Sequence, residues 1–137
     1  MKKYLLNLEQ LHQLTADIVQ KFPFGVVILR GDLASGKTTF VKAMATQLQI
    51  EDDVTSPTFS LQQCYGEKMY HYDMYNHGLE HFIALGMLEE LDKEGYHFVE
   101  WGDDELEAIL DSAGMDLLVI EIEKTSQETR EYRVKYA

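Results

Sequence analysis

The sequence predicts an α/β fold, in which a sheet is covered by helices on both faces. Segments with strand-like apolar patterns alternate along the chain with segments of helical periodicity, which is the order expected for such a sheet. The run Val26–Leu29 is short, apolar and mostly β-branched, as is typical of a central parallel strand buried on both faces. A glycine-containing segment, Gly31–Gly36, then leads directly into a helical pattern over Lys37–Leu48.

The N-terminal segment predicts a short strand followed by an amphipathic helix. Lys3–Leu6 has the pattern of the strand. Asn7 is expected to cap the helix, with Gln10 three residues later as its reciprocal partner. Pro23 ends the helical pattern. Positions at spacings of three and four form one face of this helix: Leu8, Leu11, Thr15, Ile18 and Phe22.

The rest of the chain predicts a hairpin and then alternating helices and strands. The hairpin joins Ser60–Tyr65 to Lys68–Tyr72 through a two-residue turn at Gly66 and Glu67. Cys64, inside the first of these strands, is expected to be a small buried residue. The later elements are a helix over Leu79–Leu91 with a break near Gly86, a strand over Tyr96–Val99, a helix over Asp103–Leu110, a strand over Leu117–Ile122 and an edge strand over Tyr132–Tyr136 that pairs with it.

Length and composition predict one domain, residues 1–137, with a core that needs no disulfide bonds. The chain has 12 Lys and Arg against 24 Asp and Glu, and its net charge of −12 argues against a broad phosphate-binding surface. The single cysteine fits a reducing compartment. The sequence contains no apolar run near the roughly 20 residues that cross a bilayer, and its start lacks the pattern of a signal peptide. We therefore expect a cytoplasmic protein that does not contact a membrane.

The segment from Gly31 to Thr38 matches the phosphate-binding pattern G-x-x-x-x-G-K-[ST] completely. In such a loop the glycines allow the backbone N–H groups to wrap the phosphates, and the N-terminus of the next helix points its dipole at the same anion. Lys37 supplies a positive charge for the β- and γ-phosphates, and the Thr38 hydroxyl is a hard oxygen ligand for Mg²⁺. A strand before the loop and a helix after it are the context that the pattern requires.

Two acids close predicted strands and are candidates for the magnesium shell. Asp73 follows the strand that ends at Tyr72, and Glu100 follows the strand that ends at Val99. The carboxyl ends of strands form the ligand-binding edge of an open α/β sheet. Each acid is alternatively a simple turn or cap residue. The polar segment Thr55–Phe59 is either an ordinary turn or a switch over the terminal phosphate.

Four segments together resemble the TsaE (YjeE) family of small P-loop ATPases, which act in bacterial synthesis of the threonylcarbamoyladenosine modification of tRNA. They stand in the family order and at similar spacing, between about Val26 and Gly102. The phosphate loop alone identifies only a superfamily, whereas the four together are specific. These segments are Gly31–Thr39, Thr55–Phe59, His71–Tyr75 and Glu100–Gly102.

The resemblance implies a P-loop NTPase-like three-layer sandwich, with a mainly parallel sheet and antiparallel edge strands. It implies ATP and Mg²⁺ as ligands, and it implies that Lys37 and Glu100 act in catalysis. The residues implied to bind the nucleotide are Asp32, Leu33, Ala34, Ser35, Gly36, Lys37, Thr38, Thr39 and Trp101, the last being alternatively a core residue. The residues implied to hold the metal are Thr38, Asp73 and Glu100, and those of the switch loop are Thr55, Ser56 and Thr58.

The resemblance also implies partners. Weak ATP hydrolysis is expected to be stimulated by a TsaB–TsaD heterodimer, with tRNA contacted only indirectly because a chain of charge −12 repels its phosphates. Two positions depart from the family pattern. Ala34 stands where glycine is usual, which requires a compatible φ, and Asn76 stands where arginine is frequent and cannot replace its charge or bidentate geometry.

Two other functions remain open at this stage. Small-molecule and nucleoside kinases share the phosphate loop, but they use several lid arginines to neutralise the transferred group. This chain has only Arg30, Arg130 and Arg133, and none lies in the middle where a lid is expected. The third possibility is a nucleotide-binding regulatory module without turnover, against which the two strand-end acids argue.

Overall fold

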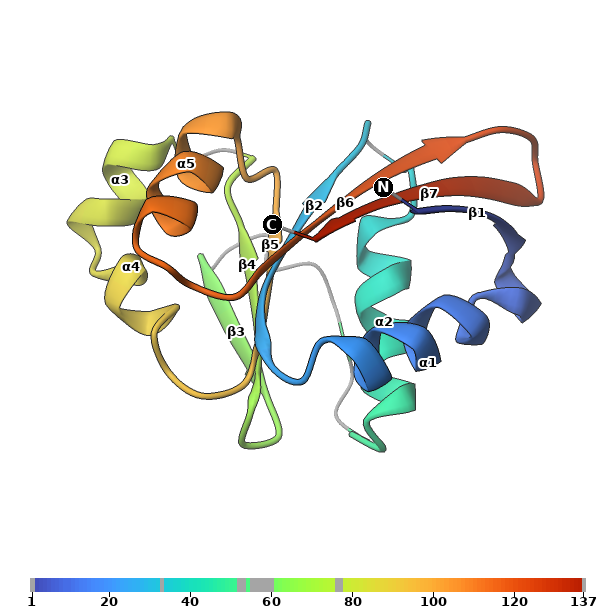
Figure 1. The fold of residues 1–137 in the computed structure, drawn as a ribbon, viewed down its shortest axis with the longest axis horizontal. Helices are drawn as coiled ribbons and strands as arrows, with labels where there is room; N and C mark the ends of the chain where they lie inside the picture. The colour runs from blue at the N-terminus through green and yellow to red at the C-terminus, as the bar shows by residue number, and fades with distance from the viewer. Residues whose placement is uncertain (1, 33, 52–53, 55–60, 76–77, 137) are drawn as a thin grey trace.

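The computed structural model describes residues 2–32, 34–51, 54, 61–75 and 78–136. In this part of the chain the strands form one seven-stranded sheet in the order β1-β7-β6-β2-β5-β4-β3 (Figure 1). The four strands β6, β2, β5 and β4 are parallel, whereas β1, β7 and β3 pair antiparallel to their neighbours. The strands are β1 Lys2–Asn7, β2 Gly25–Arg30, β3 Gln62–Tyr65, β4 Met69–Asp73, β5 Tyr96–Glu100, β6 Leu117–Lys124 and β7 Thr129–Tyr136.

Helices cover both faces of the sheet, which gives the three layers expected for the fold class (Figure 1). Because side chains alternate along a strand, Val27 and Leu29 of β2 belong to one core cluster and Val26 and Ile28 to the other. The first cluster packs beneath α1 and α2, and the second beneath α3, α4 and α5. The helices are α1 His12–Lys21, α2 Lys37–Gln47, α3 Leu79–Ala84, α4 Met87–Glu90 and α5 Asp104–Ser112.

Most predicted elements are confirmed, including the capping box between Asn7 and Gln10. That box begins a 3₁₀ turn, Leu8–Gln10 (η1), rather than the α-helix itself, which begins at His12. Gly86 breaks the predicted helix into α3 and α4, where its φ of 76° is easily adopted by glycine. Asp103 caps α5 by accepting a hydrogen bond from the Leu106 N–H at 2.8 Å.

Three expectations are wrong. The strand that contains Tyr132 pairs with β6 as expected, but it is not at the edge, because β1 pairs along its other side. The hairpin turn has three residues, since Tyr65 pairs with Met69. Cys64 is exposed, because in the edge strand β3 its side chain faces away from the core. Ser60, the expected start of that strand, lies outside the described residues.

The parallel strands place the candidate site at one edge of the sheet. Glu100, the last residue of β5, pairs with Leu29 of β2 on one side and with Asp73 of β4 on the other. The segment that follows β2 therefore begins beside Glu100, with Asp73 one strand further along the sheet.

Candidate functional site

The phosphate-binding motif forms the connection between β2 and α2. Gly31 has a φ of 156°, and a Cβ there would lie 2.5 Å from the Ile122 carbonyl oxygen, so no side chain fits. Gly36 is the N-cap of α2 with a left-handed φ of 110°. Ala34 also has a left-handed φ, 61°, which confirms that its place in the loop suits glycine better. Leu33 lies outside the described residues.

Lys37 is the cation of the loop and is almost completely buried. Its Nζ donates hydrogen bonds to the carbonyl oxygens of Gly31, at 2.7 Å, and Asp32, at 2.9 Å. The same Nζ lies 4.0 Å from the centroid of the Trp101 ring, a cation–π contact. Burial lowers the pKa of Lys37, and the carboxylates of Glu100, Asp73 and Asp32 oppose this effect. An anion bound at this loop would therefore contact the Lys37 ammonium group, which is poorly solvated by water.

Glu100 is held by groups from two other elements. Its Oε2 accepts a hydrogen bond from the Thr38 hydroxyl of α2 at 3.0 Å. The same oxygen lies 2.5 Å from Nε2 of His71 on β4, and both side chains are buried. Nδ1 of His71 lies 3.3 Å from the hydroxyl of Tyr65. The structure therefore brings the predicted residues Thr38 and Glu100 together and adds His71, which the sequence analysis had not assigned to the site.

Asp73 and Trp101 complete this side of the site. Oδ1 of Asp73 accepts a hydrogen bond from the Tyr75 N–H at 2.9 Å, so the acid also stabilises its own turn. The ring of Tyr75 lies 4.9 Å from that of Trp101, which keeps the tryptophan beside Lys37. Trp101 is half-buried and has a left-handed φ of 65°. It is packed against the second core cluster and also lies beside Lys37 of the loop.

The oxygen groups around the loop have the chemistry that Mg²⁺ prefers, because Thr38, Glu100 and Asp73 offer a hydroxyl and two carboxylates. The buried hydroxyl of Ser35 has no hydrogen-bond partner among the described residues, which leaves a donor in the loop available to a ligand. No group of three or more His, Cys, Asp or Glu side chains able to hold a metal occurs in the described part of the chain.

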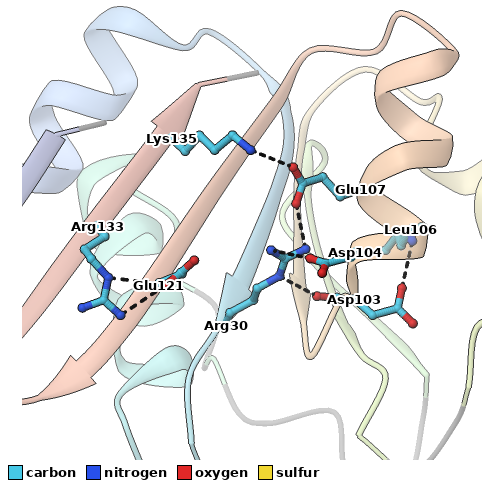
Figure 2. Close-up of polar contacts among 9 residues, drawn as sticks. Arg30, Asp103, Asp104, Leu106, Glu107, Glu121, Arg133 and Lys135 are labelled. Carbon is cyan, nitrogen blue, oxygen red and sulfur yellow. Dashed lines mark hydrogen bonds and ion pairs between the residues drawn. The ribbon is translucent and has the colours of Figure 1, made fainter.

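Arg30 ties the start of the loop to the segment after β5 (Figure 2). Its Nε donates to the Gly102 carbonyl oxygen at 3.0 Å, and its Nη2 donates to Glu107 of α5 at 2.9 Å. Nη1 lies 3.2 Å from Asp104. Lys135 of β7 reaches the other carboxylate oxygen of Glu107 at 3.2 Å. These contacts hold the Trp101–Gly102 corner against the phosphate loop.

Comparisons with known proteins identify the family of the chain. The family model described as "Threonylcarbamoyl adenosine biosynthesis protein TsaE" matches residues 5–132. The chain belongs to the TsaE family. The tRNA threonylcarbamoyladenosine biosynthesis protein TsaE of Treponema pallidum is 43% identical over 81 residues, 57% of this chain and 60% of that protein. The protein of the same name from Aquifex aeolicus is 38% identical over 107 residues, 68% of this chain and 80% of that protein.

A solved relative shows the same fold. The crystal structure of Bacillus subtilis YdiB matches with a TM-score of 0.68 at 29% identity, over 99% of this chain and 84% of that one. This TsaE-family chain spans only 50% to 66% of the length of several curated relatives that it matches.

The TsaE site contains two residues that the sequence analysis did not place there, His71 and Arg130. His71 precedes Asp73 by two positions in β4, so both face the same side, and this spacing is the signal that could have indicated it. Arg130 of β7 donates from Nε to the Ser35 carbonyl oxygen of the loop at 2.9 Å. No local pattern indicates that contact. The expected switch residues Thr55, Ser56 and Thr58, and the departure at Asn76, lie outside the described residues.

No helix among the described residues is long and apolar enough to cross a membrane.

Proposed function

We propose that this chain binds and hydrolyses ATP with Mg²⁺ as part of the threonylcarbamoyladenosine modification of tRNA. The observation that carries the proposal is the hydrogen bond between Thr38 and Glu100, which joins the phosphate loop to a strand-end acid. The family name of the matching relatives supports the pathway. The buried Lys37 supports binding of an anion at the loop.

In this proposal each residue has a separate role. Backbone N–H groups of the loop and of the first turn of α2 bind the phosphates, and Lys37 moves from its two carbonyl partners to the β- and γ-phosphates. Thr38, Glu100 and Asp73 hold Mg²⁺, which when bound neutralises charge on the phosphate oxygens. Glu100 also orients the attacking water. Because Thr38 and His71 already hold its carboxylate in place, the site needs little reorganisation when the water binds.

His71 acts in this proposal as a positioning residue for Glu100. Its ring is fully buried, and its Nε2 contacts the same carboxylate oxygen that Thr38 contacts. Two partners on one oxygen fix the rotation of the carboxyl group.

The proposed partners are a TsaB–TsaD heterodimer and, through it, tRNA. A net charge of −12 opposes direct binding to a nucleic acid, because the phosphate backbone attracts cationic surfaces. The partner pair would therefore hold the tRNA. We place this activity in the cytoplasm, where tRNA modification in bacteria takes place.

The kinase alternative receives no support from the arginines. Arg30 and Arg133 are each paired with carboxylates, and Arg130 donates to backbone carbonyl oxygens. All three belong to strands of the sheet rather than to a mobile lid. A regulatory module without turnover is distinguished from the proposal only by rate measurements.

The decisive experiment measures ATP hydrolysis by the chain alone, with the TsaB–TsaD pair, and with the pair and tRNA. We expect slow turnover alone and stimulation by the pair. Lys37→Ala should abolish ATP binding, whereas Glu100→Gln should retain binding and lose hydrolysis. Unchanged turnover in Lys37→Ala would refute the phosphate-loop assignment. Phosphoryl transfer to a small acceptor would favour the kinase, and binding without turnover under every condition would favour the regulatory module.

A further inference from the structure

A closed ring of hydrogen bonds joins the strands β3, β4 and β5 to α4 and to the loop that follows it. We name it the polar ring, and its members are Gln62, Tyr72, Glu90, Lys93 and His97. The amide nitrogen of Gln62 donates to the Tyr72 hydroxyl and to Oε1 of Glu90, each at 3.1 Å. Nδ1 of His97 lies 2.8 Å from the Tyr72 hydroxyl, and Nε2 lies 2.7 Å from the Lys93 carbonyl oxygen. Nζ of Lys93 lies 2.7 Å from Oε2 of Glu90, which closes the ring.

One arrangement of protons satisfies every bond of the polar ring. Because the Lys93 carbonyl oxygen only accepts hydrogen bonds, Nε2 of His97 carries a proton. Because the Glu90 carboxylate also only accepts, the Gln62 amide directs its nitrogen toward Glu90 and Tyr72. The Tyr72 hydroxyl therefore donates its own proton to Nδ1 of His97, which must be bare. The intact ring thus requires a neutral imidazole with its proton on Nε2.

Two members of the polar ring are buried, and their burial favours this neutral form. His97 is 1% exposed and Tyr72 is fully buried. Burial lowers the pKa of His97 below its ordinary value of 6.5, while the Lys93 carbonyl oxygen and the Glu90 carboxylate oppose this effect. Burial raises the pKa of Tyr72, so the phenol keeps its proton. Hydrogen bonds from Lys93 and Gln62 lower the pKa of Glu90, so its carboxylate stays ionised in mild acid.

Titratable groups from several elements surround His97, which lines a hollow of about 320 Å³ at the N-terminal end of β5. The charged side chains that line this hollow are Asp92, Lys93, Glu94 and Asp116. Tyr70 of β4 stacks on the imidazole with ring centroids 4.4 Å apart, and Cys64 of β3 pairs with Tyr70 in register. Tyr72 and Glu90 complete the set around His97 in the described part of the chain. The hollow gives a proton from solvent access to the buried imidazole.

A second proton on His97 is incompatible with the closed ring. With Nδ1 protonated, the imidazole donates to the Tyr72 oxygen, which already accepts from Gln62, and the Tyr72 proton is left without an acceptor. A buried donor without a partner is strongly unfavourable. Rotation of the Gln62 amide would offer its oxygen to Tyr72, but would turn the same oxygen toward the Glu90 carboxylate. The Gln62–Glu90 bond, which joins β3 to α4, is therefore the bond that breaks.

We propose that the polar ring is a proton-sensitive latch. The latch is closed at neutral pH, and protonation of Nδ1 of His97 in mild acid breaks the Gln62–Glu90 bond and releases the edge strand β3 from α4. This change needs no ATP, so the inference goes beyond the proposed function and does not rest on it. The latch acts on the strand that carries a candidate metal ligand, since Tyr72 immediately precedes Asp73 in β4.

The first test reads the proton positions in the native chain. Nitrogen-15 NMR of the histidine side chains distinguishes a bare Nδ1 from a protonated one. We expect His97 to have a bare Nδ1 and a protonated Nε2 at about pH 7.5, and to gain its second proton below about pH 6.5. A proton on Nδ1 at about pH 7.5, or an imidazole that stays neutral down to about pH 5, would overturn the latch. This measurement needs no variant.

The second test measures hydrogen exchange by mass spectrometry at about pH 7.5 and about pH 5, with each rate corrected for the intrinsic effect of pH. We expect the protection of β3 and α4 in the native chain to fall by about tenfold or more in acid, while β2 and β6 keep theirs. Gln62→Leu lacks the latch bond at every pH, so it should show the lowered protection already at about pH 7.5. Tyr72→Phe removes the hydroxyl that couples His97 to Gln62, so its β3 and α4 should be protected equally at both pH values.

His12→Gln is the matched control. His12 is exposed, and its Nδ1 bonds to the Glu9 carbonyl oxygen at 2.9 Å, outside the polar ring, so this variant should behave as the native chain does. Circular dichroism verifies that each variant is folded. Acid sensitivity in Tyr72→Phe equal to that of the native chain would overturn the latch. Unchanged protection of native β3 and α4, or an equal loss in β2 and β6, would overturn it as well.

Discussion

Replacing His71 with leucine tests the buried pair that it forms with Glu100. Leucine is close to histidine in volume, so the change removes the hydrogen bond with little change in packing. Both side chains are at most 5% exposed, and the ring nitrogen lies 2.5 Å from the carboxylate oxygen. A hydrogen bond to a charged group contributes about 1.5–3 kcal/mol, and a carboxylate left buried with Thr38 alone adds to the loss. We therefore expect His71→Leu to lower the free energy of unfolding by about 3 kcal/mol.

The assay is urea unfolding followed by the fluorescence of Trp101, the only tryptophan. With a slope of about 1.5 kcal/mol per molar urea, the midpoint should fall by about 2 M. Tyr65→Phe is the control, because it leaves the pair of His71 and Glu100 in place. It removes the 3.3 Å contact to the other ring nitrogen and the 2.6 Å hydrogen bond to Gln63, and should cost about 1–2 kcal/mol, less than His71→Leu.

A double-mutant cycle with Glu100→Leu separates the pair from general loss of packing. We expect a coupling free energy of at least about 1.5 kcal/mol, since the second change should cost little once the first is made. If the two single effects added within about 0.5 kcal/mol, the stabilising pair would be refuted.

Three further predictions concern the loop and the core. Ala34→Gly should raise the free energy of unfolding, measured in urea, by about 0.5 kcal/mol. Glycine relieves the strain of the left-handed φ of 61°, and this gain exceeds the loss from the larger entropy of the unfolded chain. A lower urea midpoint would contradict this. Arg30→Met should cost about 2 kcal/mol by the same assay, more than Arg133→Met. Arg30 donates to the Gly102 carbonyl oxygen and to Glu107, whose side chain is 18% exposed, whereas the carboxylate partners of Arg133 are 29% to 61% exposed. Equal losses would contradict the tie in Figure 2. Burial lowers the pKa of His97 from its ordinary value of 6.5, so its contribution to stability is complete above that pH and is lost as the pH falls through the folded pKa. Lowering the pH from about 7 to about 5 should therefore lower the melting temperature of the native chain more than that of His97→Gln. Melting temperatures that fall in parallel for the two proteins would contradict this.

The local patterns of the sequence account for most of the fold and for the described residues of the candidate site other than His71 and Arg130. The apolar run Val26–Leu29 predicted a central parallel strand, and the loop after it predicted the phosphate site, because both signals come from adjacent residues. Glu100 was found because a strand-end position can be read from the strand itself.

The features that were missed depend on which segments meet in space. Arg130 contacts the loop across 95 positions of sequence, and no periodicity reports such a contact. The strand β7 was placed at the edge because pairing with β6 is local, whereas pairing with β1 joins the two ends of the chain. The exposure of Cys64 depends on which face of β3 is covered, and a short run of four residues does not reveal that.

The place of β7 in the sheet has a consequence for the order of assembly during synthesis. Lys2 of β1 pairs with Val134, so β1 finds its partner only after the other strands of the described sheet have been synthesised. The same late strand carries the arginine that supports the Ser35 carbonyl. A nascent chain that ends before Thr129 therefore has an unpaired first strand and a nucleotide loop without this support. The phosphate loop thus gains this support only after β7 has been made, not while the central strands are being made.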